Sequence, residues 1–310
     1  MEKLVIIGAG IAGLTTAIYA ARANMTPLVI SGKDEGGQLM LTTVVENYPG
    51  FPEGVMGPEL ISKCREQAKK FGTRFKDGNV EAFSVKDSNN GVYEIVVEGE
   101  RIEAKSVIIA SGASARTLGI DSEKTYWAKG VHTCATCDGY FYSGKDIVVV
   151  GGGDSACEES LFLAKLVNSV TIVHRKGEFR ASKIMQERVL SNSKIKVMWN
   201  VAVDEILGDG KKVTGVRLKN AKDGKTTELN TNAVFLAIGH IPNTTAFKGV
   251  LDLDDNGYLV ADGRMRTKLS GVFVAGDVHD KIYKQAVTAA GMGCQAALEA
   301  ERYLEGITRQ

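Results

Sequence analysis

Two stretches of this 310-residue chain share one order of apolar and polar positions. Leu4 to Ser31 reads LVIIGAGIAGLTTAIYAARANMTPLVIS, and Ile147 to His174 reads IVVVGGGDSACEESLFLAKLVNSVTIVH, at a constant offset of 143 residues without a gap. Each stretch has an apolar run, a glycine-rich turn, a segment with helical periodicity and a second apolar run. The pattern predicts a strand, turn, helix and strand, present twice.

Weaker patterns surround these two stretches. Helical periodicity occurs in ELISKCREQAKKF (59–71) and KQAVTAAGMGCQAALEAERYLE (284–305), whereas GVYEIVVEG (91–99) alternates as short strands do. The apolar runs VIIASGAS (107–114) and VFLAIGHIPN (234–243) each stop on a glycine, where the chain can bend. The whole pattern predicts an α/β protein with two Rossmann-like dinucleotide-binding domains.

The glycine-rich turns have the G-x-G-x-x-G/A spacing of a dinucleotide-binding turn. The first glycine allows a sharp turn, the second lets the backbone approach a pyrophosphate, and the small third residue lets the helix pack on the strand. The N–H groups of the helix N-terminus then point at the phosphates. A turn with only a structural role is the alternative for each copy. The three positions are Gly8, Gly10 and Gly13 in the first unit, and Gly151, Gly153 and Ala156 in the second.

The end of the second strand of a Rossmann unit indicates which nucleotide it binds. An acidic residue there usually receives ribose hydroxyls, whereas a basic residue accommodates a 2′-phosphate. The second unit continues into HRKGEFR, so Arg175, Lys176 and Arg180 stand where the 2′-phosphate of NADP would lie. A solvated basic turn is the alternative. The sequence therefore favours NADPH over NADH.

The first unit has Ser31 at the corresponding position, which is neither acidic nor basic. Its ligand is indicated by TKLSGVFVAGDVHD (267–280), where Gly276 and Asp277 follow a short apolar strand. This resembles the second fingerprint of FAD-binding disulfide reductases, in which the aspartate receives the ribityl chain of the flavin. An ordinary turn at a strand end is the alternative.

Residues that contribute to FAD would thus lie at both ends of the chain. We therefore expect the NADPH-binding domain to be inserted into the FAD-binding domain. The expected boundaries are 1–113 and 244–310 for the FAD-binding domain, and 114–243 for the NADPH-binding domain, which also contains a C-x-x-C pair.

Composition and charge narrow the range of partners. The chain is 44% hydrophobic and has 38 basic against 37 acidic side chains, so it can bury large cores without attracting nucleic acid or anionic lipid. The segment after Lys3 imitates a signal peptide, but its glycine spacing and the strand that follows favour the nucleotide-binding turn. No other segment approaches the ~20 apolar residues of a membrane span. We expect a soluble protein with no nucleic-acid or membrane partner.

The five cysteines are an odd number spread over a long chain. This usage is typical of the reducing cytoplasm and not of a disulfide framework. Cys64, Cys157 and Cys294 lie on predicted helices, where small buried thiols are expected. Cys134 and Cys137 differ because they form the C-x-x-C pair in GVHTCATCDG (130–139).

These motifs closely resemble the low-molecular-weight thioredoxin reductases. GAGIAG, GGQLMLTTVVENYPGFPEG, CATCDG, GGGDSACEE, HRKGEFR, AIGHIPNT and VFVAGDV occur in the order and spacing of that family. The resemblance implies a homodimer that uses NADPH and FAD to reduce the disulfide of thioredoxin. The FAD contacts that it implies are Gly8, Ala9, Gly10, Ile11, Ala12, Gly13, Gly37, Gln38, Asn47, Val80, Asp277, Lys284, Gln285 and Ala286. The NADPH contacts are Gly151, Gly153, Asp154, Ser155, Ala156, His174, Arg175, Lys176 and Arg180.

Two positions depart from the family pattern. The family usually has arginine where this chain has Lys176, and arginine again where it has Lys284. Both lysines keep the positive charge, although an ammonium group lacks the planar fork of a guanidinium. We expect altered affinity and retained function.

The C-x-x-C pair supplies the thiol chemistry. A hydride from NADPH delivers two electrons to the flavin, and a disulfide accepts two electrons from it. By resemblance, Cys137 faces the flavin and Cys134 attacks the disulfide of thioredoxin. Asp138 is the proton donor that the family suggests, and a simple turn formed with Gly139 is the alternative.

Three other functions are alternatives to this one. A zinc-stabilised regulator would use His132, Cys134, Cys137 and Asp138, but structural zinc sites normally join two separated ligand pairs and the chain has no second pair; we expect no metal. A flavoprotein that reduces a peroxidase would carry an extra N-terminal domain, for which a first strand at Lys3 leaves no room. Flavoproteins that oxidise small dithiols with oxygen lack the predicted NADPH site.

Overall fold

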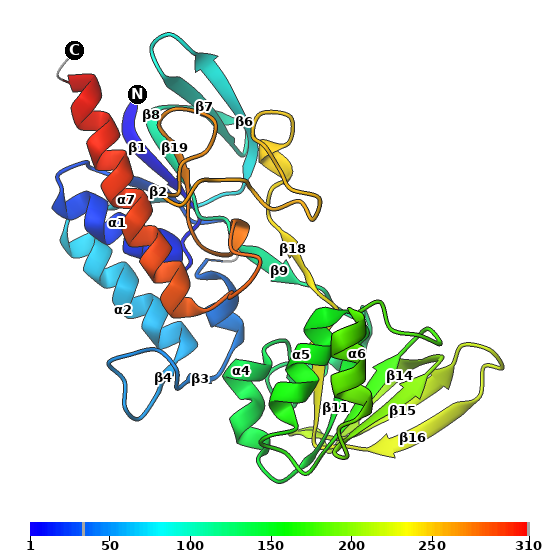
Figure 1. Cartoon of the computed structure of the whole chain (residues 1–310). Helices are drawn as coiled ribbons and strands as arrows, with labels where there is room; N and C mark the ends of the chain where they lie inside the picture. The colour runs from blue at the N-terminus through cyan, green and yellow to red at the C-terminus, as the bar shows by residue number, and fades with distance from the viewer. Residues whose placement is uncertain (33–34, 309–310) are drawn as a thin grey trace. The chain divides into compact units, whose positions relative to one another are not determined.

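The computed structural model describes residues 1–32 and 35–308 and forms two compact units. Unit 1 comprises Met1–Ser114 and Ile241–Gln310, and unit 2 comprises Ala115–His240. Each unit contains a β-sheet whose central strands are parallel, as in dinucleotide-binding domains (Figure 1). The predicted fold class, with one Rossmann-like unit inserted into another, is confirmed.

Unit 1 contains a seven-stranded sheet in the order β5-β2-β1-β8-β7-β6, with β19 also pairing with β8. β5, β2, β1, β8 and β19 pair in parallel, whereas β6, β7 and β8 form an antiparallel meander. The sequence predicted the alternating strand at 91–99, and β7 confirms it. The strands are β1 (Glu2–Ile7), β2 (Leu28–Ile30), β5 (Arg74–Lys76), β6 (Val80–Asp87), β7 (Val92–Val97), β8 (Glu100–Ile109) and β19 (Val272–Val274).

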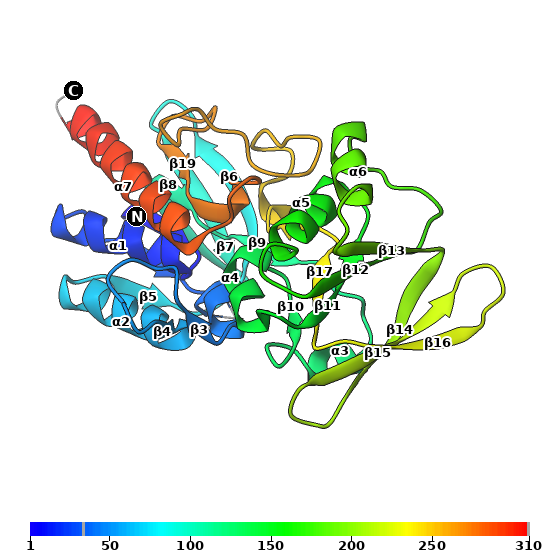
Figure 2. The same ribbon diagram turned by 60° about the horizontal axis from the view of Figure 1, so that its bottom comes forward.

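Three helices of unit 1 lie side by side in Figures 1 and 2: α1 (Ile11–Arg22), α2 (Gly57–Lys70) and α7 (Ala286–Thr308). The contact of α1 with α7 is close because Gly293 has no side chain; a Cβ there would lie 2.3 Å from the Ala12 carbonyl oxygen. The Thr16 hydroxyl donates a 3.1 Å hydrogen bond to the Gly293 carbonyl across the same contact. The first and last helices of the chain therefore share one core.

Unit 2 contains a five-stranded parallel sheet in the order β10-β17-β11-β12-β13. A separate antiparallel sheet, β14-β15-β16, is clearest in Figure 2 and was not predicted from the sequence. The strands are β10 (Val131–His132), β11 (Asp146–Gly151), β12 (Ser169–His174), β13 (Ile195–Trp199), β14 (Val201–Gly208), β15 (Val213–Asn220), β16 (Thr226–Asn230) and β17 (Ala233–Ala237). The helices are α3 (Asp121–Thr125), α4 (Ala135–Asp138), α5 (Asp154–Leu163) and α6 (Lys183–Leu190).

Two short strands, β9 (Ala113–Ala115) and β18 (His240–Pro242), pair where the chain passes from one unit to the other. Gly112 and Gly239 precede them with φ of +69° and +96°, which favours glycine. The Arg116 N–H donates a 3.0 Å hydrogen bond to the Gly239 carbonyl. The glycines predicted to bend the chain at both crossings do so.

The remaining short elements lie in unit 1 and beside α4. They are β3 (Val44–Val45), β4 (Val55–Met56) and the 3₁₀ helices η1 (Gly37–Leu41), η2 (Gly139–Tyr142), η3 (Thr245–Phe247) and η4 (Gly276–Val278). Within residues 1–32 and 35–308, we find no helix with the length and apolar character that crossing a membrane requires.

Candidate active site

The first glycine-rich turn joins β1 to α1. Gly8 has φ +112°, and a Cβ there would lie 2.2 Å from the Ala110 carbonyl oxygen. A Cβ on Gly13 would lie 1.9 Å from the Gly8 carbonyl oxygen, so the helix packs directly on the strand end. Gly10 instead faces open space, where the nearest atom to an added Cβ is 3.9 Å away. The turn therefore needs glycine for packing at two positions and leaves room for a ligand at the third.

The chain topology places this turn where open α/β sheets bind ligands. β1 leads through α1 to its neighbour β2 on one side, whereas its neighbour β8 on the other side belongs to a later part of the chain, so the turn lies at a switch in strand order. Ser31 follows β2 at this edge; it is 4% exposed, and within the described part of the chain its hydroxyl has no hydrogen-bond partner. An unpaired buried hydroxyl suits the ribose of a dinucleotide, because such a group is costly to leave unsatisfied.

Other predicted FAD residues contribute in different ways. The side chains of Ala9, Ile11 and Ala12 are buried in the core of unit 1, so only their backbone is available to a ligand. Val80, at the start of β6, likewise packs against a hydrophobic core. Gly37 begins η1 and lies beside the first turn, since a Cβ there would be 3.8 Å from the Gly10 Cα. Its neighbour Gln38 is exposed.

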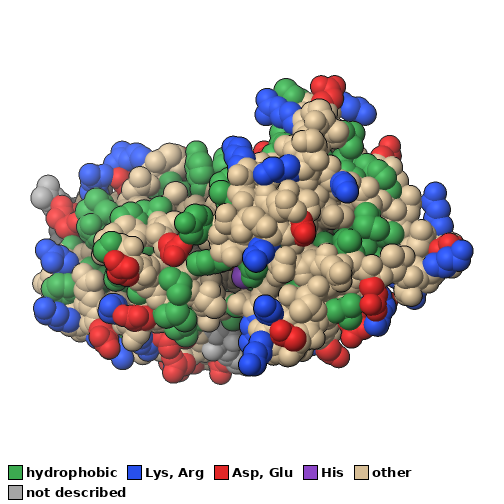
Figure 3. All heavy atoms as spheres, turned by 90° about the horizontal axis from the view of Figure 1, so that it is seen from below, with side chains coloured by type: hydrophobic (Ala, Val, Ile, Leu, Met, Phe, Trp, Pro, Cys, Tyr) green, Lys and Arg blue, Asp and Glu red, His purple; other side chains and the backbone are tan. Residues whose placement is uncertain are grey.

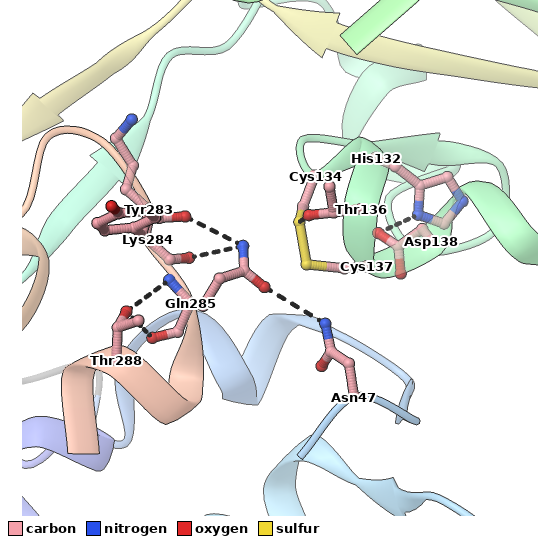
Figure 4. Close-up of a disulfide and its surroundings, with 10 residues drawn as sticks. All are labelled: Asn47, His132, Cys134, Thr136, Cys137, Asp138, Tyr283, Lys284, Gln285 and Thr288. Carbon is pink, nitrogen blue, oxygen red and sulfur yellow. Dashed lines mark hydrogen bonds and ion pairs between the residues drawn. A yellow bond between two sulfur atoms is a disulfide. The ribbon is translucent and has the colours of Figure 1, made fainter. Parts of the chain in front are cut away.

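The N-terminal end of α7 gathers a second group of predicted FAD residues, drawn in Figure 4. The Asn47 amide donates a 3.3 Å hydrogen bond to Gln285 Oε1, and Gln285 in turn donates to two backbone carbonyls. Ala286 is the first residue of α7, so it lies at the positive end of the helix dipole. The structure thus brings Asn47, Gln285 and Ala286 together within unit 1.

The loop before α7 is held by Asp280, which sequence reasoning missed. Its buried carboxylate accepts hydrogen bonds from the backbone N–H groups of Ile282, Tyr283 and Lys284 at 2.9–3.1 Å. Lys284 has φ +50°, unusual for a residue with a side chain, and this bonding sustains it. An aspartate followed by a polar loop before a helix would have been the only signal in the sequence.

Asp277 lies in η4, where the sequence placed the flavin-binding aspartate. Burial, together with the negative charge of Asp280, raises the pKa of Asp277 to about 6, although Lys284 acts in the opposite direction. Gly276 beside it has φ +75°, and a Cβ there would lie 2.9 Å from the Ala12 Cβ. The aspartate is therefore fixed close to the first helix, in the same unit as the first glycine-rich turn.

The second glycine-rich turn repeats this construction in unit 2. A Cβ on Gly151 would lie 2.5 Å from the Ala237 carbonyl oxygen and 2.7 Å from the Ala156 Cβ. Gly153 has nothing within 4 Å of an added Cβ and precedes α5. β11 leads through α5 to β12 on one side and has β17 as its other neighbour, so this turn also lies at a switch in strand order. The small third residue has the packing role that the sequence predicted.

The first residues of α5 are exposed beside this turn. Ser155 is one of them, and Asp154 is another. The Asp154 carboxylate accepts 2.9 and 2.8 Å hydrogen bonds from the N–H and hydroxyl of Ser182, which lower its pKa. The side chain of Asp154 thus ties the start of α5 to the start of α6, while its backbone N–H remains at the helix N-terminus.

The basic turn after β12 is exposed at Arg175, Lys176 and Arg180. None of these three side chains forms an ion pair or hydrogen bond with another described residue. His174 differs, because its side chain is 6% exposed and its Nε2 lies 3.0 Å from the Glu178 carbonyl oxygen. Burial lowers the pKa of His174, so the imidazole packs as a neutral group. His174 supports the turn, and the three cations remain available to an anion.

The C-x-x-C pair forms a disulfide between Cys134 and Cys137 at the start of α4 (Figure 4). Both cysteines are half-buried, and the Cys134 Sγ lies 3.4 Å from the Thr136 hydroxyl. In this oxidised form the two sulfurs are bonded to each other, so neither is a thiolate. A partly accessible disulfide of this kind is suited to thiol–disulfide exchange, in which a thiolate attacks one of its sulfurs.

Asp138 follows the disulfide and is buried, with 7% of its surface exposed. Its Oδ2 lies 3.0 Å from His132 Nδ1, and His132 Nε2 lies 2.8 Å from the Tyr142 hydroxyl. Burial and the Asp138 charge raise the pKa of Tyr142 to about 12. Asp138 is therefore not a solvated Asp-Gly turn residue. From the sequence, His132 was considered only as a zinc ligand, and Tyr142 was not singled out.

The other three cysteines differ from one another. Cys157 on α5 is fully buried, and burial raises the pKa of its thiol to about 11. Cys64 and Cys294 are only half-buried, so the expectation that all three are buried is wrong for these two. Helical periodicity predicts which face of a helix a residue lies on. How deeply that face is buried depends on the other elements that pack against it.

Charged side chains are distributed without segregation on the face in Figure 3, where basic and acidic groups are interspersed. This agrees with 38 basic and 37 acidic residues in the sequence. A strongly basic surface, which nucleic-acid binding requires, is not visible on that face.

Comparisons with known proteins agree with this geometry. A family model described as pyridine nucleotide-disulphide oxidoreductase matches residues 2–293. A thioredoxin reductase from Rickettsia conorii is 51% identical over 305 residues, covering 97% of this chain and 98% of that protein. A bifunctional thioredoxin reductase/thioredoxin from Mycobacterium leprae is 49% identical, covering 98% of this chain and 66% of that protein. The crystal structure of thioredoxin reductase from Streptococcus pyogenes is similar with a TM-score of 0.94 and 40% identity, and covers 99% of each chain.

Proposed function

Because the chain belongs to the pyridine nucleotide-disulphide oxidoreductase family, we propose that it is a thioredoxin-disulfide reductase using NADPH and FAD. The observation that carries the proposal is the Cys134–Cys137 disulfide, followed directly by the buried carboxyl of Asp138. A redox-active disulfide and two dinucleotide-binding turns in one chain are the parts that a nicotinamide-driven, flavin-dependent disulfide reductase uses.

Unit 1 has the features that FAD requires. The turn from Gly8 to Gly13 would hold the pyrophosphate, the unpaired Ser31 hydroxyl would meet the ribose, and Asp277 would receive the ribityl chain. Asn47 and Gln285, joined by a hydrogen bond, would contact the flavin from the end of α7. A bound flavin converts a two-electron hydride transfer into thiol chemistry.

Unit 2 has the features that NADPH requires. The turn from Gly151 to Ala156 would hold the pyrophosphate at the N-terminus of α5. Arg175, Lys176 and Arg180 are exposed cations without partners in the described chain, and they would bind the 2′-phosphate that distinguishes NADPH from NADH.

The two cysteines divide the exchange with thioredoxin. Cys134, as a thiolate, attacks one sulfur of the thioredoxin disulfide and forms a mixed disulfide, and Cys137 then attacks Cys134 and releases reduced thioredoxin. Two enzyme thiols are oxidised to a disulfide, and one thioredoxin disulfide is reduced to two thiols. Asp138 would transfer a proton to the departing sulfur.

Thioredoxin as the partner is supported by the relatives, one of which combines thioredoxin reductase and thioredoxin in its name. Three cysteines outside the disulfide remain free thiols, which supports the proposal that the protein works in the reducing cytoplasm. A homodimer is proposed from the family resemblance alone.

The proposal is tested by adding NADPH anaerobically to the purified protein, followed by oxidised thioredoxin, while flavin absorbance is recorded. We expect NADPH to bleach the flavin and thioredoxin to restore its colour with the formation of two thiols per thioredoxin. The Cys134→Ser variant is the control that should bleach but not pass electrons to thioredoxin. A wild-type protein that bleaches yet leaves thioredoxin oxidised would contradict the proposed substrate.

A further inference from the structure

The basic turn of unit 2, residues 175–180, has one buried side chain among exposed ones. Its cations Arg175, Lys176 and Arg180 are exposed. Phe179, which lies between them in the chain, is only 6% exposed and belongs to a hydrophobic core of the unit. A buried ring in an exposed turn anchors that turn to the core. The position of the three cations therefore depends on how Phe179 is packed.

Phe179 packs in a cluster of three aromatic rings. Its ring lies edge-on to that of Trp199 with centroids 4.5 Å apart, and its centroid is 5.9 Å from that of His174. The pairing of β12 with β13 places His174 opposite Trp199, where the two rings meet edge-on at 6.0 Å. Because each ring contacts the other two, displacing one ring disturbs the others.

The imidazole of His174 also occupies the space that a side chain on Gly152 would need. Gly152 lies in the second glycine-rich turn, at a position where the G-x-G-x-x-G/A spacing allows any residue. It does not have a positive φ, so its backbone conformation does not require glycine. The three atoms nearest to an added Cβ all belong to the His174 ring and lie 2.2–2.6 Å away. Packing against the imidazole is therefore sufficient reason for glycine at this position.

Two hydrogen bonds hold the backbone of the basic turn around this cluster. The Nε2 atom of His174 lies 3.0 Å from the carbonyl oxygen of Glu178. The N–H of Asn200, the residue after β13, donates a 3.1 Å hydrogen bond to the carbonyl oxygen of Lys176. Both bonds join the turn to residues at the ends of β12 and β13, so the turn and the aromatic cluster form one packed structure.

The nucleotide explains why the position of this turn matters. In NADPH, the pyrophosphate and the 2′-phosphate are attached to the same ribose, so their separation varies little. A protein that binds both groups must present two turns at a matching separation, and turns held in that arrangement beforehand bind more tightly because less order is lost on binding. NADH has no 2′-phosphate, so the position of the basic turn affects NADPH and not NADH.

We propose that Gly152 and Phe179 are positioning residues for nucleotide selection, which hold the imidazole of His174 between them and thereby set the basic turn against the glycine-rich turn. The inference rests on the proposed function because it takes NADPH as the nucleotide of unit 2. Glycine has no side chain and phenylalanine offers no hydrogen bond to a phosphate. Both residues therefore act through the groups that they place.

The first test measures the binding of NADP⁺ and NAD⁺ to the purified flavin-containing protein by titration calorimetry. The oxidised nucleotides cannot reduce the flavin, so binding is measured without turnover. Phe179→Ala should raise the Kd of NADP⁺ about tenfold, the size of one lost charged contact, and should hardly change the Kd of NAD⁺. Phe179→Leu keeps an apolar side chain without the ring contacts, so it should give a smaller change in the same direction. An unchanged ratio of the two Kd values in both variants would overturn the inference.

A matched control removes a phenyl ring elsewhere in the same core. Phe162 on α5 packs against the core that contains Phe179. A Cβ on Gly139 would lie 3.6 Å from the Phe162 ring, so this ring faces η2. Phe162→Ala and Phe179→Ala should both lower the unfolding free energy in urea, but only Phe179→Ala should lose preference for NADP⁺. An equal loss of preference in Phe162→Ala would show that the loss reflects general destabilisation, and the inference would be rejected.

A double-mutant cycle tests the contact between Gly152 and His174. Gly152→Ala places a Cβ where the imidazole lies, so it should displace the ring and lower the preference for NADP⁺ over NAD⁺. In a His174→Ala background the ring is absent, so adding Gly152→Ala should cause no further change in preference. An effect of the new methyl group on the pyrophosphate would weaken both nucleotides alike and cancel in the ratio. Independent and multiplicative effects of the two changes on the ratio would contradict the proposed contact.

The outcomes distinguish this inference from the proposed function. If the wild type prefers NADP⁺ and the cycle shows coupling, but thioredoxin is not reduced, the inference stands and the proposed partner fails. If thioredoxin is reduced, but Phe179→Ala and Gly152→Ala keep the full preference for NADP⁺, the inference alone fails. A wild type that binds NADP⁺ and NAD⁺ equally would refute the NADPH assignment and the inference together.

Discussion

The backbone N–H of Arg180 donates a 2.7 Å hydrogen bond to the carbonyl oxygen of Gly152. This bond fastens the basic turn after β12 to the glycine-rich turn after β11. The backbone therefore holds two turns in a fixed position relative to each other. One would bind the pyrophosphate of NADPH, and the other would bind its 2′-phosphate. The sequence places them 28 residues apart, from 152 to 180, and gives no indication of the bond.

We expect the double variant Arg175→Ala/Arg180→Ala to discriminate less between NADPH and NADH. Each lost charged contact is worth about 1.5–3 kcal/mol, so the KM for NADPH should increase about ten- to a hundredfold per contact, while the KM for NADH hardly changes. Steady-state kinetics with both nucleotides measure this. Arg188→Ala, an exposed arginine on α6, is the control. An equal increase for both nucleotides would remove the 2′-phosphate assignment.

Two substitutions in the first glycine-rich turn should separate folding from flavin binding. Gly13→Ala brings its Cβ within 1.9 Å of the Gly8 carbonyl oxygen, so both stability and flavin content should fall, with overpacking costing about 1–3 kcal/mol or more. Gly10→Ala has room for its Cβ and should fold normally, yet hinder the approach of a pyrophosphate. Urea unfolding and flavin absorbance measure the two effects. Full flavin content in folded Gly10→Ala would contradict the binding site.

The two cysteines should differ in trapping thioredoxin. Cys137→Ser leaves Cys134 able to attack but removes the residue that resolves the mixed disulfide, so an adduct should accumulate with a thioredoxin that lacks its own resolving cysteine. Cys134→Ser should give no adduct. Both variants should keep FAD and be bleached by NADPH, and both should lose thioredoxin turnover. Non-reducing electrophoresis detects the adduct, and finding it only with Cys134→Ser would exchange the two roles.

The raised pKa of Asp277, about 6 against 3.8 for a free carboxyl group, makes stability depend on pH in the flavin-free protein. A carboxyl group whose pKa is higher in the folded state contributes its stability fully below pH 3.8 and loses it as pH rises through about 6. The loss should reach about 3 kcal/mol at most. The asparagine of Asp277→Asn does not titrate. The unfolding free energy of this variant minus that of the wild type should therefore increase between pH 4.5 and 7.5. A constant difference over that range would contradict the shift.

The sequence predicted those parts of the molecule whose structure depends mainly on residues close together in the chain. Gly8, Gly13 and Gly151 lie where the turn leaves no room for a side chain, and such positions are visible as spacing in a single chain. Asp277 was predicted by the resemblance of its segment to a fingerprint of FAD-binding disulfide reductases, and its contact with FAD stays a prediction. In each case the residue type and its immediate neighbours are sufficient to indicate the role.

The missed residues depend on contacts that no spacing indicates. His132 lies six residues before Asp138, and their pairing requires β10 and α4 to turn back on each other. Asp280 was not identified because its carboxylate accepts hydrogen bonds from backbone N–H groups. Such groups are present at almost every residue, so no residue type in the sequence indicates the interaction. The sheet β14-β15-β16 was also missed, although β14 and β15 alternate buried and exposed residues. Register shifts after Val203 and Leu207 interrupt that alternation, and β16 is mostly exposed.

The helix pair α1 and α7 has a consequence for synthesis on the ribosome. The core that contains Leu4 and Ile108 also contains Phe273 and Ala300, so unit 1 cannot complete this core until nearly the whole chain has been made. Unit 2 has all its strands once residue 237 has emerged, because β10 to β17 are contiguous in the sequence. Since synthesis proceeds from the N-terminus and domains fold as units, the inserted unit should acquire protease resistance first. The N-terminal part of unit 1 therefore keeps apolar surface exposed until the residues that cover it, such as Phe273 and Ala300, have been synthesised.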